Sequence, residues 1–131
     1  MEPEVRHLIL CDDVAVDPDN YQRLNVFGLI TRIHSTVQPP FPVVRPLLCA
    51  LVLLTGGKGG GELSLRILHD PTGAVIFRSA PRQVRFVGNP AAVLGLLFRI
   101  RNCSFPAAGL YWVEVVFAGT VIARQKLWLE G

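Results

Sequence analysis

Residues 105–130 read FPAAGLYWVEVVFAGTVIARQKLWLE, and this stretch decides the fold. Two runs of β-branched, aromatic and aliphatic residues flank a short break at 118–120, and apolar side chains recur at every second position. A period of two is typical of a β-strand, so the stretch predicts a β-hairpin. No long helical pattern is present elsewhere, so a second sheet is expected to cover its apolar face. The positions predicted to face inward are Tyr111, Val113, Val115 and Phe117, then Val121, Ala123, Gln125, Leu127 and Leu129.

The rest of the chain carries the same strand signal between strong turn signals. Pro-containing or glycine-rich turns occur at 17–20, 56–61 and 70–73, where the backbone reverses easily. About eight or nine strands are expected, which predicts an all-β, two-sheet antiparallel sandwich of immunoglobulin-like or related topology. One domain is predicted over residues 1–131. Besides the hairpin, the predicted strands cover residues 6–17, 24–33, 46–55, 62–69, 74–79, 83–87 and 93–103.

Composition indicates a compact chain with a surface available to a partner. Half of the 131 residues are hydrophobic and 18% are charged, against about 25% in ordinary domains. The formal net charge of +3 permits an acidic partner without requiring one.

Targeting features favour the cytoplasm. The N-terminus, MEPEVRHLIL, lacks the sections of a signal peptide, and the longest apolar runs are far shorter than the roughly 20 residues of a membrane helix. Cys11, Cys49 and Cys103 are too few and too scattered for a disulfide framework. A reducing compartment and no membrane partner are therefore expected.

Catalytic and cofactor patterns are weak. The glycine-rich segment 55–61 departs from the phosphate-binding loop, since Val52 and Gly59 occupy positions that need Gly and Ser or Thr. No serine or cysteine shows a nucleophile, base and oxyanion arrangement. The chain is therefore predicted to be non-enzymatic and to need no cofactor.

An acidic group near the first turn leaves one metal alternative open. Asp12, Asp13, Asp17 and Asp19 could offer oxygen ligands to calcium, although their spacing does not match an EF-hand loop. Aspartates also end strands and start turns, and this structural role is favoured. The three histidines share no ligand motif, so no metal site is assigned.

Arginines gather in one quarter of the chain. Arg99 and Arg101 share a strand face and are predicted to form a basic patch, joined by neighbouring arginines if other strands bring them close. No aromatic residues alternate with them as stacking platforms, so a nucleic-acid partner is not favoured.

The outward face of the closing hairpin is the predicted protein interface. Aromatic side chains set among charges on an exposed face are typical of contact surfaces. The predicted interface residues are Trp112, Glu114, Arg124, Lys126 and Trp128.

Short motifs along the chain resemble those of a known family. They are Leu10-Cys11-Asp12-Asp13-Val14, the segment LNVFGL at 24–29, Phe41-Pro42, and a closing Pro-x-x-Gly-x-Tyr hairpin at 106–111. The chain resembles an uncharacterised bacterial family of small single-domain proteins of unknown function. The resemblance implies a β-sandwich and no assigned activity, and it transfers no catalytic residue. The last two strands are also similar to those of immunoglobulin-like domains.

Together these patterns predict a binding or assembly module that acts through an exposed sheet face or an edge strand. The expected partner is another protein or a second copy of the chain as a homodimer. The alternative is a ligand-, metal- or nucleic-acid-binding protein, or an enzyme, with its site on loops at one end of the sandwich.

Overall fold

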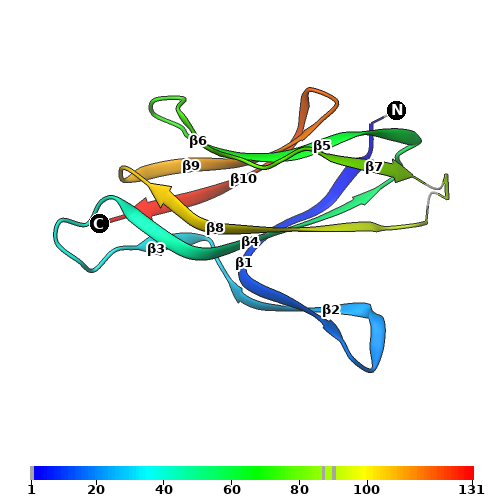
Figure 1. Ribbon diagram of the computed structural model, residues 1–131, viewed down its shortest axis with the longest axis horizontal. Helices are drawn as coiled ribbons and strands as arrows, with labels where there is room; N and C mark the ends of the chain where they lie inside the picture. Colours follow the sequence, from blue (N-terminus) through cyan, green and yellow to red (C-terminus); the bar gives the residue numbers. More distant parts are fainter. Residues whose placement is uncertain (1, 87, 90) are drawn as a thin grey trace.

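The computed structural model describes residues 2–86, 88–89 and 91–131, apart from the side chains of residues 21 and 22. Within these ranges the chain forms ten strands and two sheets (Figure 1). The strands are β1 (Glu4–Asp17), β2 (Asn20–Leu29), β3 (Arg32–His34), β4 (Val43–Thr55), β5 (Gly59–His69), β6 (Val75–Arg78), β7 (Arg82–Phe86), β8 (Leu94–Phe105), β9 (Gly109–Phe117) and β10 (Thr120–Glu130).

The two sheets form a sandwich-like fold and are not closed into a barrel. The four-stranded sheet has the order β2-β1-β4-β8, and the six-stranded sheet has the order β3-β10-β9-β5-β6, with β7 also paired to β5. Among the described strands every pairing is antiparallel except that of β10 with the short β3. The predicted all-β two-sheet architecture is confirmed, while the immunoglobulin-like topology stays a prediction. The described residues contain no helix long and apolar enough to span a membrane.

The closing hairpin supplies the centre of the core, as its alternation predicts. Tyr111, Val113 and Val115 are fully buried, and Phe117 is nearly so. The Tyr111 hydroxyl donates a hydrogen bond to the Ala107 carbonyl at 2.7 Å and accepts one from the Ala107 amide at 3.2 Å. A buried polar group therefore keeps its partners and fixes the entry of β9.

The second half of the hairpin departs from the prediction at its start. Val121 was expected to face inward but is 37% exposed. The register of β10 against β9 shifts between Val121 and Ala123, so one extra residue occupies the β10 side. Such a bulge breaks the alternation, and Ile122 and Ala123 both pack against the core instead.

β4 is central, as its continuous apolar sequence predicts, because β1 and β8 flank it. Leu48, Ala50 and Val52 face the core between the sheets. Cys49 and Leu51 point to the opposite, outer side and pack in a separate small cluster with Cys11 and Val14. The four-stranded sheet is therefore apolar on both faces.

The predicted single strand over 24–33 is wrong. The chain leaves the four-stranded sheet after Leu29, and residues 32–34 form β3 at the edge of the other sheet, beside β10. Ile33 is buried in the core there. Apolar residues of two different sheets follow each other in sequence, and a local pattern reads them as one strand.

Two further expectations concern loops and edges. Residues 35–42 connect the two sheets, as the proline-rich sequence predicts. β7 pairs with β5 along an edge of the six-stranded sheet, as expected for 83–87, although Val87 lies outside the described residues.

Candidate functional site

The outer face of the hairpin carries the five residues that the sequence predicts as an interface. The β9–β10 ladder places Trp112 opposite Lys126 and Glu114 opposite Arg124. Trp128 follows two residues after Lys126 and so lies on the same face. The structure gathers all five side chains on one surface. Their role as an interface stays a prediction.

Glu114 is the electrostatic centre of this face. Its side chain is nearly closed to water, yet Arg66 Nε lies 2.7 Å from one carboxylate oxygen and Arg124 Nε lies 3.5 Å from the other. Arg66 reaches Glu114 because the two residues are opposite each other in the β5–β9 pairing. The buried carboxylate is thus satisfied within the chain, as a buried charge must be.

Trp112 is also engaged by its own chain. Its indole N–H donates a hydrogen bond to Asp70 Oδ1 at 2.9 Å, and the Arg124 guanidinium lies 3.7 Å from the ring centroid. Lys126 Nζ is 5.7 Å from the same ring. Trp128, by contrast, is 46% exposed. Of the two indoles, Trp128 offers the more open ring to a partner.

The predicted basic patch lies on β8, where Arg99 and Arg101 are both exposed. Arg99 Nη2 is 3.7 Å from Asp13 Oδ1, so part of its charge is balanced. Arg99 also lines a groove of about 280 Å³ between β8 and the segment that leads from β6 to β7. We call this the arginine groove, and its lining residues are Phe77, Arg78, Ser79, Ala80, Arg82, Phe98, Arg99 and Ile100.

The acidic residues do not converge. Asp12 pairs with Arg45 at 2.7 Å, Asp13 pairs with Arg99, and Asp17 lies 3.7 Å from Arg23. The Asp17 carboxylate also accepts a hydrogen bond from the amide of Asp19, which is turn chemistry. Within the described ranges, no three His, Cys, Asp or Glu side chains gather as metal ligands.

The cysteine thiols lie in apolar surroundings. All three are free and buried. Burial raises the pKa of Cys11 and of Cys49, and it raises the pKa of Cys103 from 9.0 to about 11. A raised pKa disfavours the thiolate, which is the nucleophilic form.

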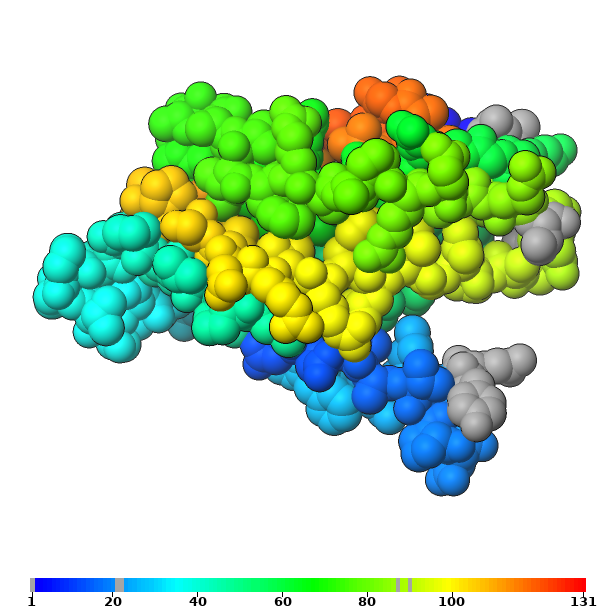
Figure 2. Space-filling model, in the orientation of Figure 1, coloured from blue at the N-terminus to red at the C-terminus, as the bar shows by residue number. Residues whose placement is uncertain are grey.

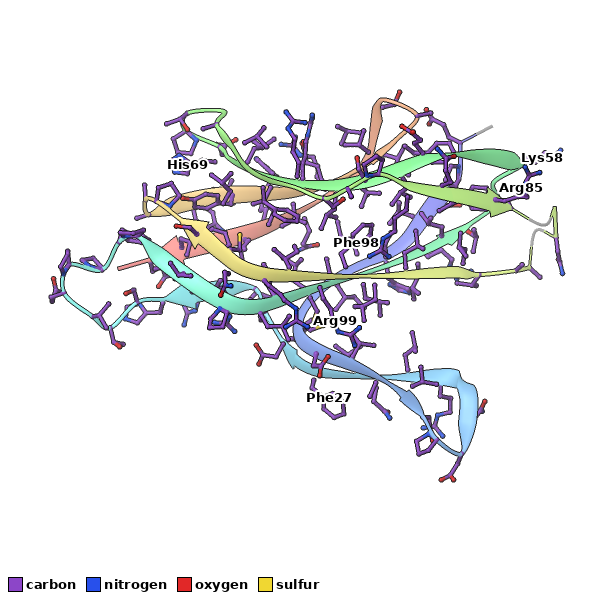
Figure 3. The ribbon with its side chains drawn as sticks, viewed as in Figure 1. Phe27, Lys58, His69, Arg85, Phe98 and Arg99 are labelled. Carbon is purple, nitrogen blue, oxygen red and sulfur yellow. The ribbon has the colours of Figure 1, made fainter. Side chains whose placement is uncertain are left out.

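The loops at one end of the sandwich border a small cavity. It lies between the β4–β5 turn and the segment that precedes β8, where Gly57, Arg85 and Asn89 contribute to its wall. Its volume is about 160 Å³, below the roughly 300–1,000 Å³ typical of small-molecule pockets. Lys58 and Arg85 both lie at this end of the molecule (Figure 3).

A surface that the sequence did not single out is the β1–β2 arm, which we define as residues 12–29. The pairing of β1 with β4 ends at Cys11, and beyond this residue β2 is the one described strand that pairs with β1. Figure 2 shows the arm (blue) projecting from the body of the molecule, with an open notch between it and β8. The arm is apolar on both faces. Its exposed large hydrophobic residues are Val16, Leu24, Val26, Phe27 and Leu29.

The notch is an apolar groove of about 500 Å³ between the arm and the outer face of the four-stranded sheet. Val14 closes its inner end, because it packs on Leu51 and the two outer-face cysteines. The LNVFGL segment carried a sequence signal for this surface, because its apolar residues occupy both odd and even positions and so point to both faces of the strand. The residues lining the groove are Val14, Ala15, Val16, Leu24, Leu51, Gly95, Leu97 and Arg99.

Comparison with known proteins identifies a family, but the description of that family assigns no activity. The model of a family of unknown function, DUF6941, matches residues 6–130. No curated protein matches the chain.

Proposed function

The chain belongs to the DUF6941 family of unknown function, and we propose that it is a non-enzymatic assembly module that forms a homodimer through the β1–β2 arm. The observation that carries the proposal is the arm's apolar surface, exposed on a hairpin that no other described strand flanks. Two isolated strands are at best marginally stable in water. A partner that covers this surface would stabilise the arm.

The apolar arm adjoins the outer face of the four-stranded sheet at the notch, where Val16 and Leu24 face Leu97. Leu29 is 69% exposed and Phe27 is 53% exposed on the arm. Leu47, Leu53 and Leu97 lie beside the small outer cluster and are only partly buried. Apolar patches of this kind on a folded protein are typical of association sites.

A second copy fits this surface because most of its acidic charge is balanced by arginines of the same chain. Three of the four aspartates of the arm are paired with arginines, Asp12 with Arg45, Asp13 with Arg99 and Asp17 with Arg23. The fourth, Asp19, is exposed in the turn at the tip of the arm. A twofold interface brings the same patch against itself, so an unbalanced charge would repel its own copy. The pairing of three of the four aspartates limits this repulsion.

The edge of β2 also favours strand pairing across a twofold axis. β2 is the outermost strand of its sheet, and Arg23 is its one charged residue; it contains no lysine or proline, which often protect an edge. Its ten residues extend about 33 Å at roughly 3.3 Å per residue. An antiparallel β2–β2 contact would join two sheets into one.

Two features support the non-enzymatic and cytoplasmic parts of the proposal. The buried thiols have raised pKa values and are poor nucleophiles. Free cysteines persist in a reducing compartment. A bacterial origin is part of the same proposal and comes from the sequence resemblance.

The test is the solution mass of the chain by light scattering and sedimentation, from about 1 to 200 µM, a span that brackets ordinary dimer affinities. We expect twice the chain mass of 14.4 kDa. Leu29→Lys and Phe27→Lys place a charge in the interface and should each yield a monomer with unchanged circular dichroism. The matched control is Val37→Lys, since Val37 is 63% exposed but lies outside the arm.

Two results would contradict the proposal. A wild-type monomer over the whole concentration range would exclude the homodimer. A dimer that survives both arm substitutions, or dissociates equally in the Val37→Lys control, would exclude the arm as its interface.

A further inference from the structure

The arginine groove lies where an edge of one sheet adjoins an edge of the other (Figure 2). β8 is the last strand of the four-stranded sheet, and β6 and β7 form the facing edge of the six-stranded sheet. In Figure 2 the surface of β8 (yellow) adjoins that of β6 and β7 (green) along this front. The groove therefore opens beside a free strand edge.

Three arginines from separate segments line this groove without a carboxylate among its lining residues. They are Arg78 at the end of β6, Arg82 at the start of β7 and Arg99 on β8. In the part of the chain that the structure describes, Arg78 and Arg82 form no ion pair. The groove is consequently positive, and among the described residues only Arg99 of its three arginines has part of its charge balanced, by Asp13.

Arg82 is held in place by an aromatic ring. Its guanidinium lies 4.2 Å from the centroid of Phe98, which is buried. Stacking on a ring fixes the guanidinium plane but leaves its N–H donors for another acceptor. Figure 3 shows Phe98 between the sheets and Arg99 on the outer side of β8. Arginines thus flank both faces of the β8 edge.

The backbone of β8 supplies a second kind of recognition. β8 pairs with β4 over Leu94–Phe105 and with no other described strand. In a ladder, alternate residues direct their N–H and C=O groups away from the partner, so the free edge can accept one more strand. Peptides bind such edges through main-chain hydrogen bonds, while side chains on either face set specificity.

We infer that the β8 edge binds an extended acidic segment of another protein as an added strand. Carboxylates on one face of that strand would reach Arg78 and Arg82, and those on the other face would reach Arg99 and Arg101. Arginine matches a carboxylate with two parallel hydrogen bonds, which gives both charge and geometry. Nucleic acid fits less well, because Phe98 is buried and Phe77 packs against the core, so the rings of the groove are poorly placed to stack on bases.

The centre of this site is separate from the homodimer surface. β2 and β8 are the opposite edges of the four-stranded sheet. Arg99 lines both the arginine groove and the notch beside the arm, whereas Arg78 and Arg82 do not line the notch. A monomeric chain could still bind the segment, and a dimer could still fail to bind it.

The test uses fluorescence anisotropy with a labelled twelve-residue peptide in which glutamate alternates with threonine. We expect saturable binding that weakens as salt rises from about 50 to 500 mM, since screening acts on exposed charges. The peptide with glutamine in place of glutamate should bind at least tenfold more weakly. Two further peptides test strand addition, one N-methylated at the odd-numbered residues and the other at the even-numbered residues. One of the two should bind at least tenfold more weakly, because its methyl groups replace the amide hydrogens that face the β8 edge.

Charge reversal in the groove locates the site. Arg78→Glu with Arg82→Glu should lower the affinity at least tenfold, and Arg78→Glu alone, which disturbs no ring contact, should lower it severalfold. The matched control is Arg6→Glu, because Arg6 is exposed on β1 in the same sheet, beyond β4. This control should change the affinity less than twofold.

Several outcomes would overturn the inference. The inference is excluded if the glutamine peptide binds as tightly as the glutamate peptide. It is also excluded if both N-methylated peptides bind as tightly as the unmethylated one, or if the Arg78→Glu, Arg82→Glu double variant binds as tightly as the wild type. A single-stranded oligonucleotide of equal charge that binds more tightly than the peptide would assign the groove to nucleic acid. Absence of any binding would leave the arginines as charges that protect the edge against self-pairing.

Discussion

Glu114 lies beneath two arginines on the outer face of the hairpin, with only 5% of its surface exposed. Glu114→Gln keeps the shape but removes the charge and turns one acceptor oxygen into an NH2 donor. One of the two arginines, Arg66 or Arg124, therefore loses its acceptor. We expect the free energy of unfolding to fall by roughly 1–3 kcal/mol, since hydrogen bonds to charged groups exceed neutral ones. Urea unfolding at pH 7 measures it.

The control for this prediction is Glu62→Gln. Glu62 is exposed and accepts one hydrogen bond from Gln83. Its substitution should change stability by less than about 0.5 kcal/mol, as surface changes usually do. Equal losses of stability in Glu114→Gln and Glu62→Gln would show that the buried ion pairs of Glu114 stabilise the fold no more than an exposed hydrogen bond does.

Tyr111 combines a fully buried ring with two hydrogen bonds to the backbone of Ala107. Tyr111→Phe keeps the ring contacts, including the edge-on packing with Phe105, but leaves the Ala107 amide and carbonyl without this partner. We expect a loss of roughly 1–2 kcal/mol in the free energy of unfolding. An unchanged urea midpoint would show that water replaces the hydroxyl at no cost.

At the level of the element, the β1–β2 arm depends on Gly28. Its φ of 65° lies in the left-handed region, and a Cβ at this position would collide with the Asp12 side chain. Gly28→Ala therefore adds both backbone strain and a clash, and it should displace Asp12 from Arg45. We expect the free energy of unfolding to fall by roughly 2–3 kcal/mol. Amide hydrogen exchange at Leu24–Val26 should become faster.

Gly73→Ala separates the two causes. Gly73 has a φ of 71° in the β5–β6 turn, but a Cβ there meets no atom within 4 Å. This variant carries the backbone strain alone, about 1–2 kcal/mol, and should leave exchange in the arm unchanged. If the two variants lose the same stability, the close approach of Asp12 to Gly28 is relieved without cost.

At the level of the whole molecule, stability should depend on alkaline pH through buried thiols. Burial raises the pKa of Cys103 to about 11 from 9.0, so the folded chain holds this proton more tightly than the unfolded chain. The stability linked to this proton is complete below pH 9 and decreases as pH rises toward 11. Burial raises the pKa of Cys11, Cys49 and Tyr111 as well, and these groups act in the same direction.

Comparison with Cys103→Ala isolates the contribution of one thiol. Between pH 8.5 and 10.5 the wild type should lose about 1–2 kcal/mol more in free energy of unfolding than this variant, because one pKa unit corresponds to about 1.4 kcal/mol. Urea unfolding at the two pH values measures the difference. Parallel losses in both proteins would contradict a role for Cys103.

Much of the fold was accessible from the sequence, because strand side chains alternate between two faces whatever the strand pairs with. The alternation correctly placed Tyr111, Val113 and Val115 in the core and put Trp112 and Trp128 on the outer face. It failed at Val121, because a bulge adds a residue that only the pairing with β9 reveals. Turn residues at 17–20 and 70–73 also predicted their reversals correctly.

The sequence by itself determined the all-β class, the central position of β4 and the inward faces of most strands, since these follow from local apolar periodicity. Only the tertiary structure decided that residues 24–33 divide between two sheets and that the arm stands away from β4. The same holds for the grouping of Arg78 and Arg82 with the predicted Arg99. Strand order and edges depend on pairing between distant segments, and periodicity within one segment carries no information about its neighbour.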